Sequence, residues 1–598
     1  MDTTAKERVQ GGSFLWESVL KADPFIDAEI SQEHLTFVET IKAFIKKEIL
    51  PLADSIEAKE PGLIPKLMKK VADLGLFLFE IPEEYGGLSI PKTVGVLAAQ
   101  HMSALASFSV SCGAHIGIGT TPIILYGSHE QKSKYLPLIA SAEKISSYAL
   151  TEPGAGSDAL GIKTTAKLSP DGKHYILNGT KQFITNAGFA DLMITYAKVD
   201  GEHFTAFIIE TKTPGVHIGI EEKKMGIKGS STCSVTLEDC KVPVENLLGE
   251  IGKGHYIAFN TLNAGRLKLG IATGGTAKHV LVNAIQYGLM RKQFGTPIVE
   301  FQSMKSRIGS MVTRIYALDS MAYRTVGYLD DAMATLDKTA PDYSKKVAKF
   351  LEEYTTEASA LKVFGSEMLS YVVDEGLQMY GGYGFIQDYQ VERFYRDSRI
   401  NRIFEGTNEI NRMLIPAMLL RKAMKGSIPL LDACGKATEE ISSGNPKEKG
   451  VSGFLSEQIR ALERAKTYVL YIIALIGQRY GMELEKEQDL LMTISDNITD
   501  IYALDSTIAR VRKMATMKGE AAVEIPQAIA EAFTTETINR LTERNRHAIA
   551  TMFSGTELGE ELKKIDKFLP FVPVNLTALR GKIADPLIRD GNWTLSPW

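Results

Sequence analysis

Apolar residues recur at helical spacing through most of the first 145 residues of the chain. Gln32–Ile49 and Ile64–Phe77 carry them three and four positions apart, which is the period of one face of an α-helix. Pro82–Gly87 interrupts the pattern, and a run of small residues, Ala104–Thr120, follows it. Such a run suits either closely packed helices or a helix that lines a cavity. We therefore expect residues 1–145 to form an N-terminal helical domain.

The period of the apolar pattern changes after this region. Short apolar or alternating stretches are separated by Gly, Asn, Asp and Pro, which is typical of strands joined by turns. These stretches are Tyr175–Leu177, Leu192–Val199, Phe204–Glu210 and Cys233–Leu237. Residues 146–255 are therefore predicted to form a middle, mostly antiparallel β-domain.

Helical spacing returns in long patterns such as Ile257–Met290 and Met304–Leu329. These patterns predict a second helical domain over residues 256–428. The stretch Asp432–Gly453 is polar and rich in Gly, Ser, Lys and Glu, and it predicts a linker over residues 429–454.

A further helical pattern, Leu455–Ile549, predicts an additional C-terminal helical domain over residues 455–598. The tail of this region contains Pro570, Pro573 and Pro586, and we expect it to be irregular. No internal repeat is found. The predicted fold class is mainly α with a central β-domain.

Composition and charge narrow the function by exclusion. The chain has 598 residues, 44% of them hydrophobic, and a net charge of -4, which excludes a strongly basic nucleic-acid binder. Its four cysteines show no Cys/His ligand spacing, so neither a disulfide scaffold nor a metal site is expected. Met1–Gln10 lacks the apolar core of a signal peptide, and the longest apolar run, Tyr468–Gly477, is about half of a membrane-spanning length. We expect a cytoplasmic protein without a transmembrane segment.

Three segments carry candidate chemistry. In the first, Tyr148–Asp158, a short strand leads into a Pro/Gly loop whose backbone N–H groups could approach a ligand closely, with Thr151 and Ser157 as hydrogen-bonding arms. An ordinary turn is the alternative, and neither GxGxxG nor GxxxxGK[ST] is present there. In the second, Asn178–Gly188, a tight Asn-Gly hairpin is expected before a strand. A flat cofactor could stack on its Phe183, although core packing is the usual role of such a ring.

The third segment places Glu405 between Phe404 and Gly406, shortly after Met379–Phe385. A carboxyl group in an apolar pocket has a raised pKa, which suits a catalytic base. A solvated glutamate at the start of a helix is the alternative.

Together, in this order and spacing, the segments resemble the acyl-CoA dehydrogenase family. The match runs from Glu33 to Arg421 through TEPGAGSD, KQFITNAG, KMGIKGSSTCSV, RKQFG, QMYGGYGF and FEGTNEI. The extra C-terminal region resembles the very-long-chain branch. The resemblance implies an N-terminal helical domain, a β-barrel-like middle domain and a C-terminal four-helix bundle, with FAD between the last two, plus an additional C-terminal helical domain.

The resemblance also implies roles for individual residues. Residues expected at the cofactor are Tyr148, Leu150, Thr151, Gly156, Ser157, Phe183, Ile184, Thr185, Arg291, Gln293, Phe294, Gln378, Gly382, Thr407 and Glu409. Of these, Arg291, Gln293, Phe294, Gln378 and Gly382 would reach the FAD of a neighbouring subunit. Residues expected at the substrate are Ala155, Gly156, Ser157, Asn263, Arg266, Phe404 and Gly406. The family usually has Trp in place of Phe183.

The implied reaction is α,β-dehydrogenation of an acyl-CoA to a trans-2-enoyl-CoA in fatty acid β-oxidation. Glu405 would remove the α-proton while hydride passes from the β-carbon to flavin N5. The Glu405 backbone N–H and a flavin ribityl hydroxyl would polarise the thioester carbonyl. Some relatives, including the isovaleryl branch, carry the base immediately before the arginine that matches Arg266. That position is Gly265 here, which leaves Glu405 as the base.

Chain length, assembly and partners follow from the same resemblance. Val110–Gly119 would form the floor of the acyl pocket, and its mostly small residues predict a long acyl chain, with helix packing as the alternative explanation. The additional domain predicts a homodimer, and an electron-transfer flavoprotein is the implied acceptor. Asp432–Gly453 lacks the broad apolar face of an interfacial helix, so membrane attachment is not expected. An acyl-CoA oxidase and a non-catalytic assembly factor of the same fold are the competing interpretations.

Overall fold

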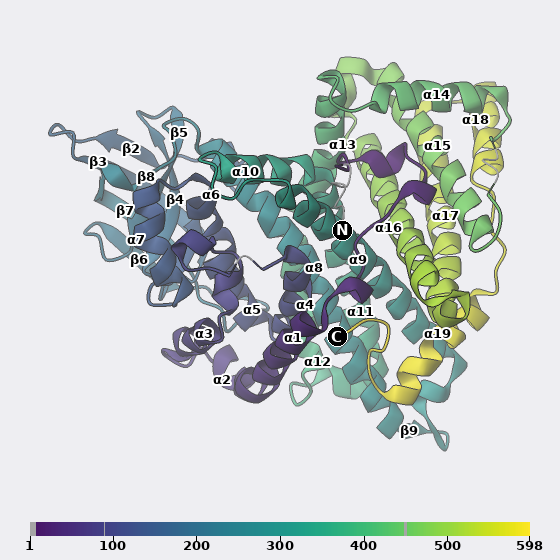
Figure 1. Ribbon diagram of the computed structural model, residues 1–598, viewed down its shortest axis with the longest axis horizontal. Helices are drawn as coiled ribbons and strands as arrows, with labels where there is room; N and C mark the ends of the chain where they lie inside the picture. Colours follow the sequence, from purple (N-terminus) through teal and green to yellow (C-terminus); the bar gives the residue numbers. More distant parts are fainter. Residues whose placement is uncertain (1–7, 89, 448–450) are drawn as a thin grey trace.

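The computed structural model describes residues 8–88, 90–447 and 451–598, so residues 1–7 of the polar N-terminal segment and 448–450 of the predicted linker lie outside it. The β-domain lies at one end of the molecule, the additional helical domain at the other, and the long helices of the bundle between them (Figure 1). The predicted fold class is confirmed.

The N-terminal domain consists of short helices. They are α1 (Gln32–Phe44), α2 (Ala53–Glu57), α3 (Leu63–Asp73), α4 (Lys92–Met102), α5 (Ala106–Cys112), α6 (Thr121–Tyr126) and α7 (His129–Ala140). The small-residue run continues from α5 into one π-helical turn, η8 (Gly113–Ile118). Among the described residues, Ala106–Tyr126 is the one stretch long and apolar enough to cross a membrane, and 67% of its window is buried inside the protein, as in a core helix.

The middle domain is built on one eight-stranded sheet. Its strands are β1 (Ser146–Ala149), β2 (Thr165–Leu168), β3 (His174–Thr185), β4 (Leu192–Val199), β5 (His203–Glu210), β6 (Val216–Glu221), β7 (Thr232–Pro243) and β8 (Leu247–Leu248). Their order is β6-β7-β3-β2-β4-β5-β8, with β1 added on β4. All pairings are antiparallel except those of β4 with β1 and β2.

The expected hairpin at Asn178-Gly179 is wrong. Strand β3 runs straight through both residues, and its register against β7 shifts by one residue between Leu177 and Gly179. A side chain at Gly179 would collide with Thr164, because its Cβ would lie 2.7 Å from the Thr164 Cα. The glycine therefore serves a β-bulge where two backbones approach closely.

The bundle consists of three long helices and three shorter ones. They are α8 (Gly254–Met290), α9 (Gln302–Ala334), α10 (Tyr343–Glu353), α11 (Thr355–Tyr380), α12 (Val391–Ser398) and α13 (Asn408–Met424), with a two-stranded hairpin of β9 (Lys292–Gln293) and β10 (Thr296–Pro297) after α8. Glycines let these helices approach closely: a Cβ at Gly270 would lie 2.9 Å from the Leu361 carbonyl oxygen, and one at Gly275 only 2.1 Å from that of Gln100.

The additional domain corrects two predictions. Its helices are α14 (Leu430–Ser443), α15 (Ser456–Tyr480), α16 (Gln488–Lys518), α17 (Glu524–Met552), α18 (Gly555–Phe568) and α19 (Leu576–Asp590). The prediction of a linker is wrong where α14 lies, because four of its apolar residues, at positions 430, 434, 437 and 441, fall on one helical face and are buried. The tail is likewise not irregular throughout, because α19 buries Ile583, Ala584, Leu587 and Ile588.

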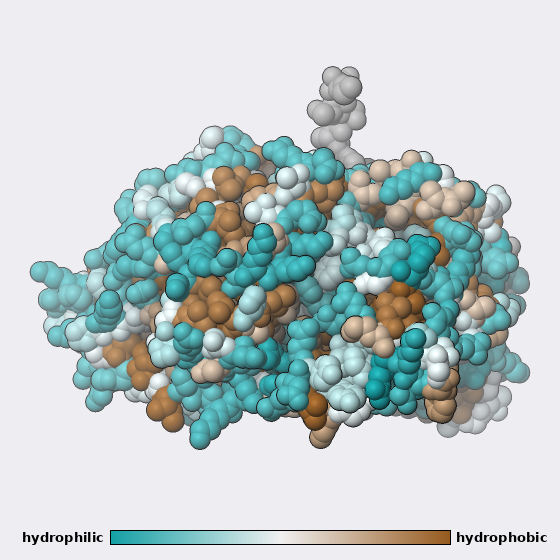
Figure 2. Space-filling model, turned by 90° about the horizontal axis from the view of Figure 1, so that it is seen from below, coloured by the Kyte–Doolittle hydropathy of each residue, from teal (hydrophilic) through white to brown (hydrophobic). Residues whose placement is uncertain are grey.

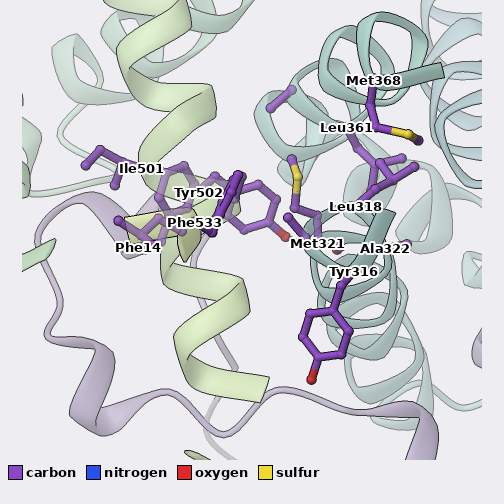
Figure 3. Packing of buried hydrophobic residues seen from close by; sticks show 14 of the residues in the cluster. Phe14, Tyr316, Leu318, Met321, Ala322, Leu361, Met368, Ile501, Tyr502 and Phe533 are labelled. Carbon is purple, nitrogen blue, oxygen red and sulfur yellow. Dashed lines mark hydrogen bonds between the residues drawn. The ribbon is translucent and has the colours of Figure 1, made fainter. Parts of the chain in front are cut away.

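The additional domain shares one hydrophobic core with the bundle. Phe14 from the N-terminal segment, Tyr316 from α9, Tyr502 from α16 and Phe533 from α17 belong to the same buried cluster (Figure 3). The rings of Phe14 and Tyr502 have centroids 4.5 Å apart. The face of the molecule shown in Figure 2 is mostly hydrophilic, with hydrophobic side chains gathered in separate patches. The helices of the bundle and of the additional domain therefore pack around one common core.

Candidate active site

Glu405 lies in the turn between the 3₁₀ segment η13 (Arg399–Arg402) and α13. Glu405 and Gly406 both have left-handed backbones, with φ of 56° and 79°. Thr407 then caps α13, since its hydroxyl oxygen accepts a hydrogen bond from the Ile410 N–H at 3.2 Å. A left-handed glutamate is uncommon in proteins, and strained positions of this kind cluster at functional sites.

Three buried side chains hold this turn by its carbonyl oxygens. Arg266 Nε donates to the Glu405 oxygen at 3.2 Å, and Lys362 Nζ donates to the Gly406 oxygen at 2.8 Å. Asn411 Nδ2 donates to the oxygens of Gly406 at 2.8 Å and Thr407 at 3.0 Å. The backbone of the turn is therefore held by side chains of the neighbouring helices. The Glu405 side chain takes no part in these hydrogen bonds.

The Glu405 carboxylate is in an apolar setting. Its Oε2 atom is buried and has no hydrogen-bond partner among the residues that the structure describes. Burial raises the pKa of Glu405 to about 7, against the opposing effects of the Arg266 and Lys362 cations. A solvated glutamate is therefore excluded. Gly265 faces the carboxylate so closely that a Cβ there would lie 2.6 Å from Oε2.

A cavity of about 1020 Å³ extends from Glu405 into the protein. Thr185, Phe404 and Gly265 line it together with Glu405, and residues of the predicted floor, such as Gly113, line it further along. The space next to Gly113 is open, with nothing within 4 Å of where its Cβ would be. The small residues of this segment therefore border a cavity.

The segment Tyr148–Asp158 is anchored at Glu152. The Glu152 carboxylate accepts hydrogen bonds from the Lys163 N–H at 2.6 Å, the Thr164 N–H at 3.1 Å and the buried Lys181 Nζ at 2.8 Å. Beyond this anchor, Gly156 and Ser157 are exposed, and Gly156 has open space where a Cβ would be. The loop therefore offers accessible backbone on a fixed base, which suits a polar ligand.

Four of the residues predicted to bind the cofactor differ in how far their side chains are exposed. Phe183 does not pack in the core: its backbone is left-handed, with φ of 60°, and 62% of the residue is exposed. Ile184 and Leu150 are buried in the hydrophobic core, so only their backbones can face a flavin. Tyr148 is buried next to Glu405.

The remaining predicted cofactor residues are spread more widely. Thr151 and Thr407 are half-buried, and Glu409 is exposed on the first turn of α13. Five exposed residues lie outside the lining of the Glu405 cavity, on the β9–β10 hairpin or near the end of α11, namely Arg291, Gln293, Phe294, Gln378 and Gly382. Phe294 is 95% exposed, and the Arg291 guanidinium lies 5.5 Å from the ring centroid of Tyr383 in the segment after α11. Their placement leaves them available to a second subunit, and that role stays a prediction.

Known acyl-CoA dehydrogenases are similar to this chain, and the similarity extends over its whole length. Family models for the N-terminal, middle and C-terminal domains of acyl-CoA dehydrogenases match residues 31–143, 147–240 and 252–420. A further acyl-CoA dehydrogenase C-terminal domain model matches residues 464–567. A probable acyl-CoA dehydrogenase of Bacillus subtilis is 44% identical over 595 residues, which cover 100% of both chains. The chain belongs to the acyl-CoA dehydrogenase family.

Two further members of the family are similar to most of this chain. The mitochondrial very long-chain specific acyl-CoA dehydrogenase of Rattus norvegicus is 32% identical over 543 residues, which cover 86% of this chain and 79% of that protein. The crystal structure of an acyl-CoA dehydrogenase complexed with FAD from Bacillus anthracis superposes with a TM-score of 0.95 and 44% identity, covering 98% of this chain and 100% of that one.

The acyl-CoA dehydrogenases are FAD-dependent, and the residues present in this dehydrogenase fit the cofactor. The exposed Phe183 ring and the accessible backbone at Gly156 offer an aromatic face and a hydrogen-bond donor. Thr185, two residues after Phe183, lines the cavity.

Sequence reasoning missed two residues of this dehydrogenase, Lys362 and Asn411, and assigned a different role to Arg266. Arg266 and Asn263 are buried under the Glu405 turn, where Arg266 donates to the Asn263 side-chain oxygen at 2.9 Å; their contact with CoA stays a prediction. One signal was available for Lys362, a lysine within the apolar run Ala360–Phe364 of α11. A charged residue in such a run needs a buried partner, but the sequence does not say which.

Proposed function

We propose that the protein oxidises long-chain acyl-CoA to trans-2-enoyl-CoA, with Glu405 as the catalytic base. The observation that carries this proposal is the Glu405 carboxylate, whose buried Oε2 atom has no hydrogen-bond partner within the described part of the chain and lies at a largely apolar cavity. A carboxylate that is held in place by its backbone and has a raised pKa is suited to accept a proton.

Each group of the site has a separate role in the proposed reaction. The Glu405 backbone N–H donates a hydrogen bond to the thioester carbonyl, which stabilises the negative charge that develops on its oxygen. The α-carbon's C–H bond then breaks, its proton passes to the Glu405 carboxylate, and its electron pair forms the double bond. Bound FAD supplies the acceptor for the hydride that leaves the β-carbon. A bound acyl chain would displace water from the apolar part of the cavity, which would strengthen the hydrogen bond to the carbonyl oxygen and the basicity of Glu405.

The pH dependence of the rate follows from the state of the base. Since burial raises the pKa of Glu405 to about 7, the carboxyl group is protonated and inactive below this value and ionised above it. We expect kcat/KM for palmitoyl-CoA to rise with pH through about 7, as measured under steady-state conditions with an artificial acceptor. A flat profile between about pH 5 and pH 8 would contradict this assignment.

The long-chain preference is supported by the size of the cavity and by its small residues. Its volume of about 1020 Å³ lies at the upper end of the roughly 300–1,000 Å³ usual for ligand pockets. The proposal is tested with butyryl-, octanoyl-, palmitoyl- and eicosanoyl-CoA, with mass spectrometry to confirm a product lighter by two hydrogens. A sharp optimum at butyryl-CoA would refute the long-chain preference and leave the reaction type in place.

Filling the cavity at Gly113 is expected to shorten the preferred chain. A leucine there would occupy the open space that a long acyl chain uses, whereas a short chain does not reach it. We expect Gly113→Leu to lower the ratio of kcat/KM for palmitoyl-CoA to that for butyryl-CoA by at least about 10-fold. An unchanged ratio in a variant that keeps its flavin would show that the chain lies elsewhere.

We further propose that the protein is a cytoplasmic homodimer that acts in β-oxidation and passes electrons to an electron-transfer flavoprotein. The exposed Phe294 and Phe385, near Arg291, support a subunit interface, because large exposed apolar side chains gather at such surfaces. The free cysteines of the described residues, all four buried, fit a reducing compartment. Sedimentation equilibrium of the FAD-loaded protein tests the dimer, and a monomer would refute it.

A further inference from the structure

Lys362 is a fully buried cation beside the catalytic turn, and the proposed mechanism does not use it. It lies on α11 with a relative exposure of 0%. Its Nζ donates to the Gly406 carbonyl oxygen at 2.8 Å and to the Asn408 side-chain oxygen at 2.7 Å. Burying a lysine costs hydration free energy, which its hydrogen-bond partners must offset. These two contacts therefore indicate that Lys362 stabilises the turn.

The first contact fixes the backbone that presents Glu405. Left-handed backbone is disfavoured at a residue other than glycine, so the Glu405–Gly406 turn depends on its surroundings. Lys362 is the donor that reaches this turn from α11. The second contact extends the link, because Asn408 Nδ2 donates in turn to the Ser366 hydroxyl at 3.0 Å and to the Glu367 carboxylate at 3.0 Å, both on α11.

The charge of Lys362 acts on the same group. Three other charged residues face it besides Glu405, namely Arg266 from α8, Glu409 from α13 and Glu367 from α11 itself. Burial lowers the pKa of Lys362 to about 7, and Glu405 is the strongest of the groups that oppose this shift. Conversely, the Lys362 cation lowers the pKa of Glu405, together with Arg266.

We propose that Lys362 is a positioning residue for the catalytic base, holding the Glu405–Gly406 turn against α11 and favouring the ionised Glu405 carboxylate through its positive charge. This inference rests on the proposed role of Glu405. The proposed role has two components, the hydrogen bond to the turn and the positive charge, and different substitutions of Lys362 remove them.

The test compares Lys362→Met, which removes both parts, with Lys362→Gln, which keeps a donor without the charge. The measurement is the rate of flavin reduction by palmitoyl-CoA, in the absence of oxygen and as a function of pH. We expect both variants to shift the acidic limb of the profile upward by about one pH unit, because Glu405 is harder to ionise without the cation. We expect the maximal rate to fall by about 10-fold or more in Lys362→Met, and by less in Lys362→Gln.

Lys278→Met is the matched control. Lys278 is equally buried on α8, where it pairs with Asp319 at 2.8 Å, roughly three helical turns beyond Arg266. It should lower stability as the loss of a buried ion pair does, and leave the acidic limb where it is in the wild-type protein. A shift of the limb in this control equal to that in Lys362→Met would overturn the proposal.

A second readout does not depend on turnover. The infrared band of the protonated Glu405 carboxyl group, identified as the difference between each protein and its Glu405→Gln partner, is titrated with pH. We expect its midpoint to be higher in Lys362→Met and Lys362→Gln than in the wild-type protein. Equal midpoints would overturn the inference, even where one variant folds poorly and only the other can be titrated. If the wild-type protein oxidises no acyl-CoA, the proposed function fails, and the infrared titration still decides the effect of Lys362.

Discussion

Glu405→Gln is expected to lower kcat with palmitoyl-CoA by about 10³-fold. The amide has nearly the shape of the carboxylate but cannot accept the α-proton. Gly265, which faces the carboxylate, has no side chain. The Arg266 and Lys362 side chains donate hydrogen bonds to the carbonyl oxygens of the turn. Turnover with an artificial acceptor, at equal flavin content, gives the measurement.

The same substitution has a predicted effect on stability that separates a removed base from a damaged fold. The pKa of Glu405 is raised in the folded protein, so its contribution to stability is present at low pH and is lost as pH rises through about 7. Glu405→Gln should therefore melt at a higher temperature than the wild-type protein at about pH 8, and at a similar temperature at about pH 5. Lower stability together with lost activity would point to misfolding instead.

Gly265→Ala is expected to lower kcat by about 10²-fold with little change in stability. The added Cβ would lie 2.6 Å from Glu405 Oε2 and 2.9 Å from its Cδ, so the carboxylate must move away from its position. Because these atoms end a flexible side chain, the movement costs little folding free energy, whereas a base displaced by about 1 Å loses much of its rate. Activity and melting temperature are measured on the same flavin-loaded sample.

Gly477→Ala provides the matched control for a glycine-to-alanine change inside a long helix. Gly477 lies in α15, and nothing is within 4 Å of where its Cβ would be. This variant should be as active as the wild-type protein and stabilised by up to about 1 kcal/mol, since alanine is the better helix former. If Gly265→Ala behaved in the same way, Glu405 would not need the position that the structure gives it.

The layout of the fold could be predicted from the sequence where the apolar period is long and regular. The period of Ile257–Met290 predicted α8, and the alternating stretches predicted the strands of the middle domain. The prediction failed where polar residues outnumber the buried ones. In α14 a narrow apolar stripe is buried within a polar sequence, and composition alone made it resemble a linker.

The candidate site could be predicted only in part, because its residues come from distant parts of the chain. The apolar neighbours of Glu405 correctly indicated a raised pKa, and burial is its main cause. The partner of Lys362 lies 44 residues further along the chain, and only tertiary packing brings the two together. The left-handed backbone of Phe183, likewise, turns its ring out of the core against the usual preference of such a residue.

The central claim is that Glu405 is the base of an acyl-CoA dehydrogenation. The most direct test mixes the FAD-loaded protein with palmitoyl-CoA in the absence of oxygen and records the visible flavin band, with Glu405→Gln in parallel. We expect rapid bleaching in the wild-type protein and an unchanged band in the variant. Bleaching at the same rate in both proteins, or a wild-type band that no acyl-CoA affects, would contradict it.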